Sequence, residues 1–219
     1  MNIEQLEAGI QYWKNHTRWP RDFHQGLYQR LSQKREAGVE LFFDRDMIRL
    51  LRQWQATRGK GVTNAFIEDR GAELWPLVLL LYDSLLAMED DQGNKVQGFG
   101  AVSWEQVSPL FYQVAKIKGV KSPVFASKLC HFLLPSFYLP CDQKVLGISR
   151  YTYEQYWKQC QKEWQECMDK DPLIARLQEE LPDLEDMGYS CYRCYPWATK
   201  LTELCRIGQE HGQARKGVT

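Results

Sequence analysis

Apolar residues recur at intervals of three and four along most of this 219-residue chain, and runs that alternate apolar with polar residues are scarce. Near the N-terminus, the recurring residues are Ile3, Leu6, Ile10 and Trp13. This spacing puts apolar side chains on one face of an α-helix, whereas a half-buried strand needs a period of two. The pattern therefore predicts an all-α fold of roughly nine or ten helices.

Proline residues and polar capping residues mark where the helices should begin. After the first helix, we expect starts near Pro20, Asp44, Thr63, Ser103, Ser122, Thr152, Asp171 and Pro196. Pro76 should break or kink the helix that starts near Thr63, because proline has no N–H for the helical ladder. Beyond Pro76 the sequence is apolar on nearly all sides, which predicts a central buried helix.

The segment DDQGNKVQGFG, residues 90–100, is rich in turn-forming residues and predicts a boundary between subdomains. We expect an N-terminal helical subdomain over 1–89, a second helical subdomain over 101–211 and a flexible tail over 212–219.

Composition is that of a folded globular protein, with 44% hydrophobic and 13% aromatic residues. The N-terminus lacks the basic start and apolar run of a secretory signal. The longest apolar run, residues 76–88, is too short to span a bilayer and contains Asp83. Seven cysteines, an odd number, suit a reducing compartment. These features predict a cytoplasmic protein without a membrane partner.

Charge is uneven along the chain although the formal net charge is zero. Residues 14–60 hold eleven Lys or Arg against five acids (+6), and residues 112–150 hold six against one (+5). Residues 61–111 hold two against eight (−6), and residues 151–199 hold five against ten (−5). Either helix faces vary by chance, or the two basic segments form one electropositive surface for a polyanion.

Two expected helices, 107–117 and 122–134, are joined by the turn Gly119-Val120-Lys121. A glycine-bearing turn lets the amide groups at the start of the second helix approach a phosphate, and the helix dipole favours an anion there. The candidate DNA-binding residues are Lys118, Gly119, Val120, Lys121 and Ser122. The alternative is an ordinary helix pair with a glycine turn.

This stretch resembles the helix-hairpin-helix DNA glycosylase superfamily, in particular its 8-oxoguanine glycosylase-like members, over about residues 104–150. In that family a Gly-Val-Gly hairpin leads to a helix with a catalytic lysine, and a Val-Pro-Val-Asp segment follows whose aspartate lines the base pocket. Here Gly119-Val120 matches the hairpin and Leu139-Pro140-Cys141-Asp142 matches the aspartate segment.

Two positions depart from the family pattern. Lys121 replaces the second glycine, and Pro123 stands where bifunctional members carry the lysine. Lys128 lies about a turn and a half farther on and is a weak candidate nucleophile. The resemblance thus implies monofunctional hydrolysis that depends on Asp142, without a covalent enzyme intermediate.

Asp142 has two interpretations. It is a good N-cap for a helix starting at Gln143. A carboxylate beside an apolar segment also suits cleavage of a glycosidic bond, because it stabilises positive charge on the sugar and orients water. The two roles are compatible.

Cysteine spacing gives a weaker signal. Two residues separate Cys191 from Cys194, a spacing found in zinc sites, and Cys205 and His211 follow downstream. However, Cys205 falls on the apolar face of the last expected helix. Cys160 and Cys167 are too far from Cys191 for an iron–sulfur loop. We predict no metal and no cofactor.

The sequence therefore predicts a DNA-binding helix-hairpin-helix protein that resembles a base-excision glycosylase. One alternative is a non-enzymatic all-α protein-interaction module. The other is a glycosylase-like fold that has lost its chemistry, which Lys121 and Pro123 favour.

Overall fold

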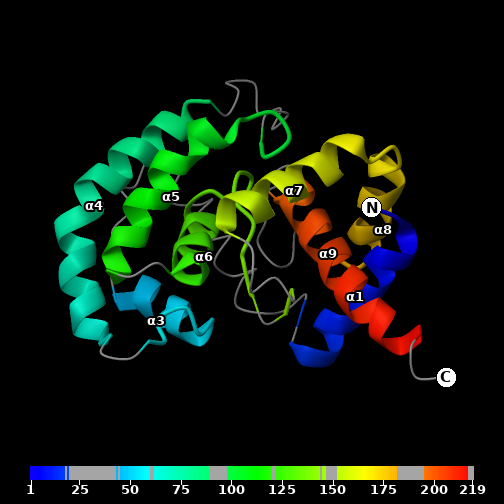
Figure 1. Cartoon of the computed structure of the whole chain (residues 1–219), viewed down its shortest axis with the longest axis horizontal. Coiled ribbons are helices and arrows are strands. Elements are labelled where there is room, and N and C mark those ends of the chain that lie inside the picture. Colours follow the sequence, from blue (N-terminus) through cyan, green and yellow to red (C-terminus); the bar gives the residue numbers. More distant parts are fainter. Residues whose placement is uncertain are drawn as a thin grey trace. The chain divides into compact units, whose positions relative to one another are not determined.

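The structure is a computed structural model, and it is all-helical in the part of the chain that it describes. The described residues are 1–17, 19, 43, 45–59, 62–88, 98–119, 122–143, 145–146, 152–181 and 195–216. They contain eight α-helices and no strand (Figure 1). The all-α prediction is confirmed, while the helix count is below the expected nine or ten. The helix expected between Pro20 and Gly38 lies outside the described residues.

The chain divides into two compact units, and the division differs from the one predicted. Unit 1 comprises Met1–Arg30 and Asp142–Thr219, and unit 2 comprises Leu31–Cys141. The predicted boundary, residues 90–100, falls inside unit 2, where the helices before and after it pack together. Turn-forming residues mark a loop, but they carry no information on which helices pack across it.

Unit 1 contains α1 (Ile3–His16), α7 (Tyr153–Glu166), α8 (Lys170–Glu179) and α9 (Trp197–Lys216). Its first and last helices, α1 and α9, are packed together (Figure 1). Their backbones approach closely at two glycines, because a Cβ on Gly9 would overlap the Leu204 carbonyl and one on Gly208 would overlap the Gln5 carbonyl. The ends of the sequence are thereby joined in one core. That core is formed by Leu6, Ile10, Trp19, Cys167, Leu173, Leu177, Leu181, Tyr195, Leu201, Leu204 and Cys205.

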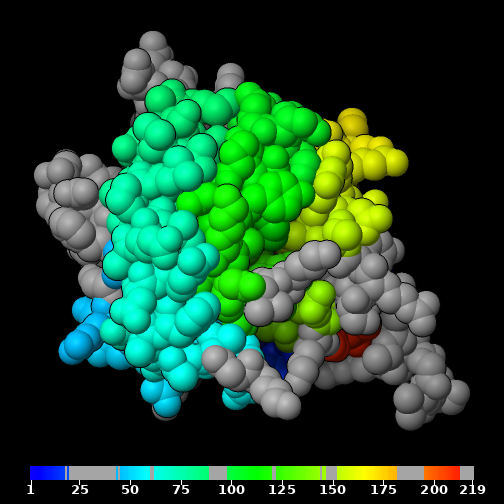
Figure 2. Space-filling model, turned by 60° about the vertical axis from the view of Figure 1, so that its left-hand side comes forward, coloured from blue at the N-terminus to red at the C-terminus, as the bar shows by residue number. Residues whose placement is uncertain are grey.

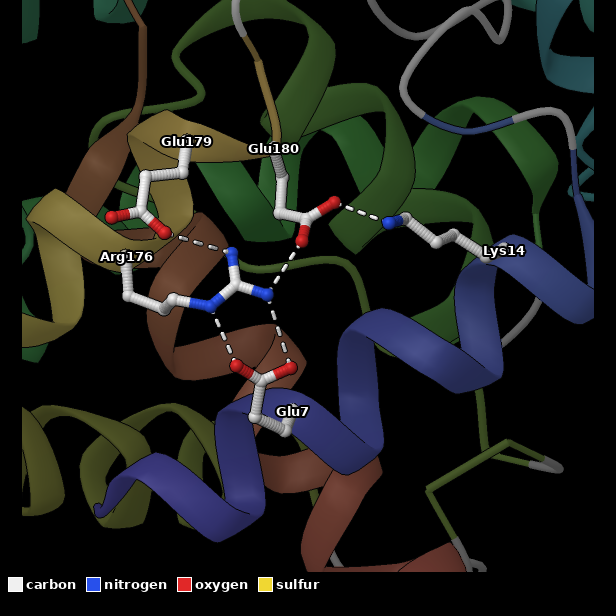
Figure 3. A network of polar contacts seen from close by, with 5 residues as sticks. All are labelled: Glu7, Lys14, Arg176, Glu179 and Glu180. Carbon is white, nitrogen blue, oxygen red and sulfur yellow. Dashed lines mark hydrogen bonds and ion pairs between the residues drawn. The ribbon is translucent and has the colours of Figure 1, made fainter.

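A network of charged side chains connects α1 with α8 (Figure 3). Arg176 donates from Nε to Glu7 Oε1 at 2.6 Å and from Nη2 to Glu7 Oε2 at 3.2 Å. The same Nη2 lies 2.6 Å from Glu180 Oε1, and Lys14 pairs with the other oxygen of Glu180. Hydrogen bonding to Glu7 and Glu180 raises the pKa of Arg176 above its usual value. Burial opposes ionisation of Glu180, but hydrogen bonds from Lys14 and Arg176 outweigh it and lower the pKa of that carboxyl.

Unit 2 contains α3 (Arg45–Gln53), α4 (Asn64–Leu86), α5 (Trp104–Lys118) and α6 (Pro123–Leu133). The helix α4 begins after Thr63, whose side chain accepts from the Phe66 N–H at 3.1 Å, as predicted. It continues through Pro76, so the expected break does not occur. The helices α4 and α5 lie side by side, and α6 packs against α5 (Figure 1).

The prediction that α4 is a central buried helix is wrong. One side of it is buried through Ile67, Trp75, Val78, Tyr82 and Leu85, but Leu77 and Leu80 are exposed. Among the described residues, no helix is both long enough and apolar enough to cross a membrane. At the C-terminus, α9 continues through Lys216 and so includes residues assigned to the predicted tail.

Candidate functional site

The expected phosphate-binding turn lies between α5 and α6, which are packed against each other. Gly119 ends α5 in the left-handed conformation (φ +73°) and is exposed. A Cβ on Gly119 would also come within 3.3 Å of the Phe66 ring, so both backbone and space favour glycine. Ser122 caps α6, accepting the Phe125 N–H at 3.4 Å, and Pro123 occupies the first turn. Val120 and Lys121 lie outside the described residues.

Lys118 does not present its ammonium group to solvent, which removes the basis for the predicted phosphate contact. The residue is 7% exposed, and its Nζ donates to the carbonyls of Ala56 at 2.9 Å and Arg58 at 2.6 Å. The Ser122 hydroxyl is a third neighbour at 3.3 Å. An ammonium has three N–H groups, and these three oxygens can accept all of them. Burial lowers the pKa of Lys118. We therefore assign Lys118 a positioning role, since it joins the start of α6 to the segment after α3.

Lys128 is similarly enclosed, and the structure gives no support to its weak candidacy as a nucleophile. It is 1% exposed, and its Nζ donates to the Trp54 carbonyl at 2.9 Å. The ammonium also lies 4.8 Å from the centre of the Trp54 ring. A lysine that attacks a sugar must reach solvent-accessible substrate with its amine deprotonated. At 1% exposed, the Lys128 amine does not reach such a substrate in this structure.

Asp142 is partly exposed, and its carboxylate contacts the backbone of the residues that follow it. Asp142 Oδ1 accepts from the Val145 N–H at 3.5 Å, and the Asp142 carbonyl accepts from the Leu146 N–H at 2.9 Å. These contacts close a turn, because residues 143 and 145–146 are in a turn and the expected helix does not begin at Gln143 in the described residues.

Three aromatic rings form a stack that sequence reasoning missed, and the charge of Asp142 acts on its central member, Tyr12. Tyr12 stacks on His16 and on His211, with ring centroids 4.1 Å apart in both pairs and interplanar angles of 19° and 16°. Two rings this close to Tyr12 would overlap if they shared a face, so they cover opposite faces. His211 Nε2 donates to the Val145 carbonyl at 2.7 Å. Burial, and then the negative charge of Asp142, raise the pKa of the Tyr12 hydroxyl.

The stack could be found only in part from the sequence. Tyr12 and His16 are four residues apart on α1, which is the spacing of neighbours on one helix face. His211 comes from the far end of the chain, and no local pattern connects it with α1. Its approach follows from the packing of α9 on α1.

The described cysteines are buried thiols. Cys130, Cys141, Cys160, Cys167 and Cys205 are free. Burial raises the pKa of the Cys130 thiol well above its usual value and that of Cys205 to about 12. Within the described part of the chain, no group of three or more His, Cys, Asp or Glu could hold a metal ion. The pair Cys191 and Cys194 lies outside that part, so the prediction that it holds no metal stays untested.

The candidate residues are divided between the two units. Lys118, Gly119, Ser122 and Lys128 belong to unit 2, whereas Asp142 belongs to unit 1. The structure brings Lys118 and Ser122 into contact, and the charge of Asp142 acts on the Tyr12 hydroxyl. No protein-family model, curated protein or solved structure matches this chain.

Proposed function

We propose that this chain is a DNA-binding protein of the helix-hairpin-helix type, and that Asp142 is the carboxylate of a base-excision reaction without a covalent enzyme intermediate. The observation that supports binding is the α5–α6 pair, in which an exposed left-handed Gly119 precedes the Ser122-capped start of α6. At such a turn, backbone N–H groups and the helix dipole can meet a phosphate without a side chain intervening.

Exposed basic residues near the turn can supply the remaining charge. Arg58 is exposed, and its carbonyl is held 2.6 Å from Lys118 Nζ. Lys116, also exposed, lies in the last turn of α5. Contacts of this kind bind the DNA backbone irrespective of sequence and weaken as salt rises.

Catalysis is proposed for Asp142 because the residue is partly exposed and its negative charge acts on the hydroxyl of Tyr12. A fixed negative charge stabilises the cation that develops on the sugar when the base leaves. The described lysine of α6, Lys128, is enclosed by Trp54, and Pro123 has no amine. Both facts favour direct attack by water over a Schiff base.

Binding is tested with labelled duplex DNA over a series of salt concentrations. We expect Lys121→Glu to weaken binding and Lys158→Glu, an exposed position on α7, to leave it unchanged. Lys118→Glu is unsuitable, because it would bury a carboxylate against the carbonyls of Ala56 and Arg58. Equal affinity of the wild type and Lys121→Glu, or no salt dependence, would remove the turn from the binding surface.

Catalysis is tested by single-turnover release of a base from oligonucleotides that carry a panel of damaged bases. Asp142→Asn keeps the side-chain size and much of the capping, and we expect it to slow release on the order of a hundredfold or more. Asp171→Asn, an exposed aspartate of α8, is the matched control and should be neutral.

Each result separates the candidate functions. Equal rates for wild type and Asp142→Asn would refute the role of Asp142. A protein–DNA adduct trapped by borohydride would show a lysine nucleophile and refute the monofunctional reaction. Duplex binding without release of any base would leave a glycosylase-like fold that has lost its chemistry. Absence of both binding and release would leave the interaction module.

A further inference from the structure

The outer face of α4 is apolar and yet exposed. Leu80 is 65% exposed and Leu77 is 45% exposed, while Ala72 and Pro76 also lie at the surface. Exposed apolar residues that adjoin one another at the surface are a feature of interaction sites.

The exposed apolar residues form one continuous stripe. Ala72, Pro76 and Leu80 are four residues apart, so they follow one another along the same side of the helix, and Leu77 is adjacent. We call these four residues the α4 stripe. In Figure 2, α4 lies at the surface along most of its length with α5 beside it. On α5, Tyr112 is also 52% exposed.

Acidic side chains accompany the stripe. Asp69, Glu73 and Asp83 are exposed on α4. Arg70 is paired with Glu73, at 3.2 Å from Nη1 to Oε2, and it also donates to the Lys116 carbonyl at 3.4 Å. The surrounding sequence has the same sign, because residues 61–111 hold eight acids against two basic residues.

These charges discriminate between possible occupants of the stripe. In a symmetric dimer, antiparallel α4 helices centred on Pro76 would place Asp69 opposite Asp83 of the second copy, twice. Like charges that face each other destabilise a contact. Anionic lipid surfaces and nucleic acids are repelled in the same way. A cationic protein segment is attracted, and its apolar side chains can cover the leucines.

We propose that the α4 stripe is a docking site for a basic amphipathic helix of a partner protein. Leucines or other apolar residues of that helix, spaced three and four apart, would cover Leu77 and Leu80. Its Lys or Arg residues would lie beside Asp69, Glu73 and Asp83. This proposal does not depend on the proposed DNA-binding turn, although Arg70 of α4 donates to the Lys116 carbonyl near that turn.

The test selects ligands for the full chain from a library of random 16-residue peptides displayed on phage. We expect the selected sequences to be rich in Lys and Arg and to carry apolar residues at helical spacing. A synthetic copy of the most frequent peptide is then measured by fluorescence anisotropy. Leu77→Ser/Leu80→Ser should weaken its binding at least about tenfold. Asp69→Asn/Glu73→Gln/Asp83→Asn should weaken it about threefold or more, and raised salt should do the same.

Met168→Ser is the matched control, because Met168 is 92% exposed but isolated from α4 in sequence and belongs to unit 1. It should leave peptide binding unchanged. Selection of acidic or non-amphipathic peptides, or of none, would overturn the proposal, as would unchanged affinity of the leucine variant. A dimer in sedimentation equilibrium that Leu80→Ser dissociates would identify a second copy as the occupant. A marked fall in melting temperature of the leucine variant would show that the stripe is covered within the chain.

Discussion

The two units accommodate their cations in different ways. In unit 1, Arg176 lies between carboxylates, with Glu7 and Glu180 in direct hydrogen bonds and Glu179 at 3.6 Å. In unit 2, Lys118 and Lys128 are almost fully buried, and the partners described for them include the main-chain carbonyls of Trp54, Ala56 and Arg58. In unit 1 the negative charges of carboxylates balance the arginine, whereas in unit 2 the dipoles of main-chain carbonyls surround the lysines.

The kind of partner, carboxylate or main-chain carbonyl, determines the structural role of each cation. The Arg176 network joins α1 to α8. Because it is partly exposed, solvent weakens the attraction between its charges. The lysines of unit 2 satisfy carbonyls that follow α3, where Gln55 has a positive φ of 57°. Carbonyls after a helix end lack intrahelical partners, and a buried ammonium can supply the missing donors. Lys118, which was predicted to bind DNA, and Lys128, which was predicted as a weak candidate nucleophile, are thus buried within unit 2.

The largest effect should come from Lys118→Met. The substitution keeps an unbranched apolar side chain but leaves the carbonyls of Ala56 and Arg58 without their donor, so unfolding free energy should fall by about 2 to 3 kcal/mol. Lys116→Met is the matched control, since Lys116 is exposed on the same helix and should change stability by less than about 0.5 kcal/mol. Urea denaturation followed by circular dichroism measures both. Equal stability of the two variants would show that the carbonyls do not depend on Lys118.

An intermediate effect is expected for Arg176→Met. Without the guanidinium, three carboxylates on α1 and α8 lose their common partner and repel one another, and unfolding free energy should fall by about 1 to 2 kcal/mol. Lys158→Met, which removes an exposed pair with Glu154 on α7, should cost less than about 0.5 kcal/mol. If both variants lose the same small amount, the network adds no more than an ordinary surface pair.

Local features of the fold could be predicted from the sequence. The helices α4 and α5 begin after Thr63 and Ser103, as predicted, and Thr63 accepts the Phe66 N–H. On α1, Leu6 and Ile10 are buried as their spacing predicts. These features depend on residues within one or two helical turns, and the helical period contains that information.

Long-range features could not be predicted in the same way. Lys118 meets carbonyls 60 and 62 residues away, and Lys128 meets one 74 residues away. A lysine can extend into solvent or fold its long side chain inward, and the choice depends on packing that the local pattern does not contain. His211 reaches Tyr12 for the same reason, through the contact between the first and last helices.

The smallest effect is a difference in pH dependence between the two units. The pKa of Glu180 is lower in the folded chain, where Lys14 and Arg176 donate to it, than in an unfolded chain. A carboxyl with a lowered pKa binds fewer protons when folded, so its stabilisation is complete above the unfolded value of about 4.3 and is lost as pH falls through the folded value. Glu180→Gln should therefore destabilise the chain at pH 7 by about 1 kcal/mol or less, and progressively less below about pH 4.

Main-chain carbonyls do not titrate, so the loss of unfolding free energy caused by Lys118→Met should stay constant over the same pH range. Denaturation of both variants at several pH values measures this contrast, and a Lys118→Met effect that decays at acid pH would reveal a carboxylate partner for that lysine.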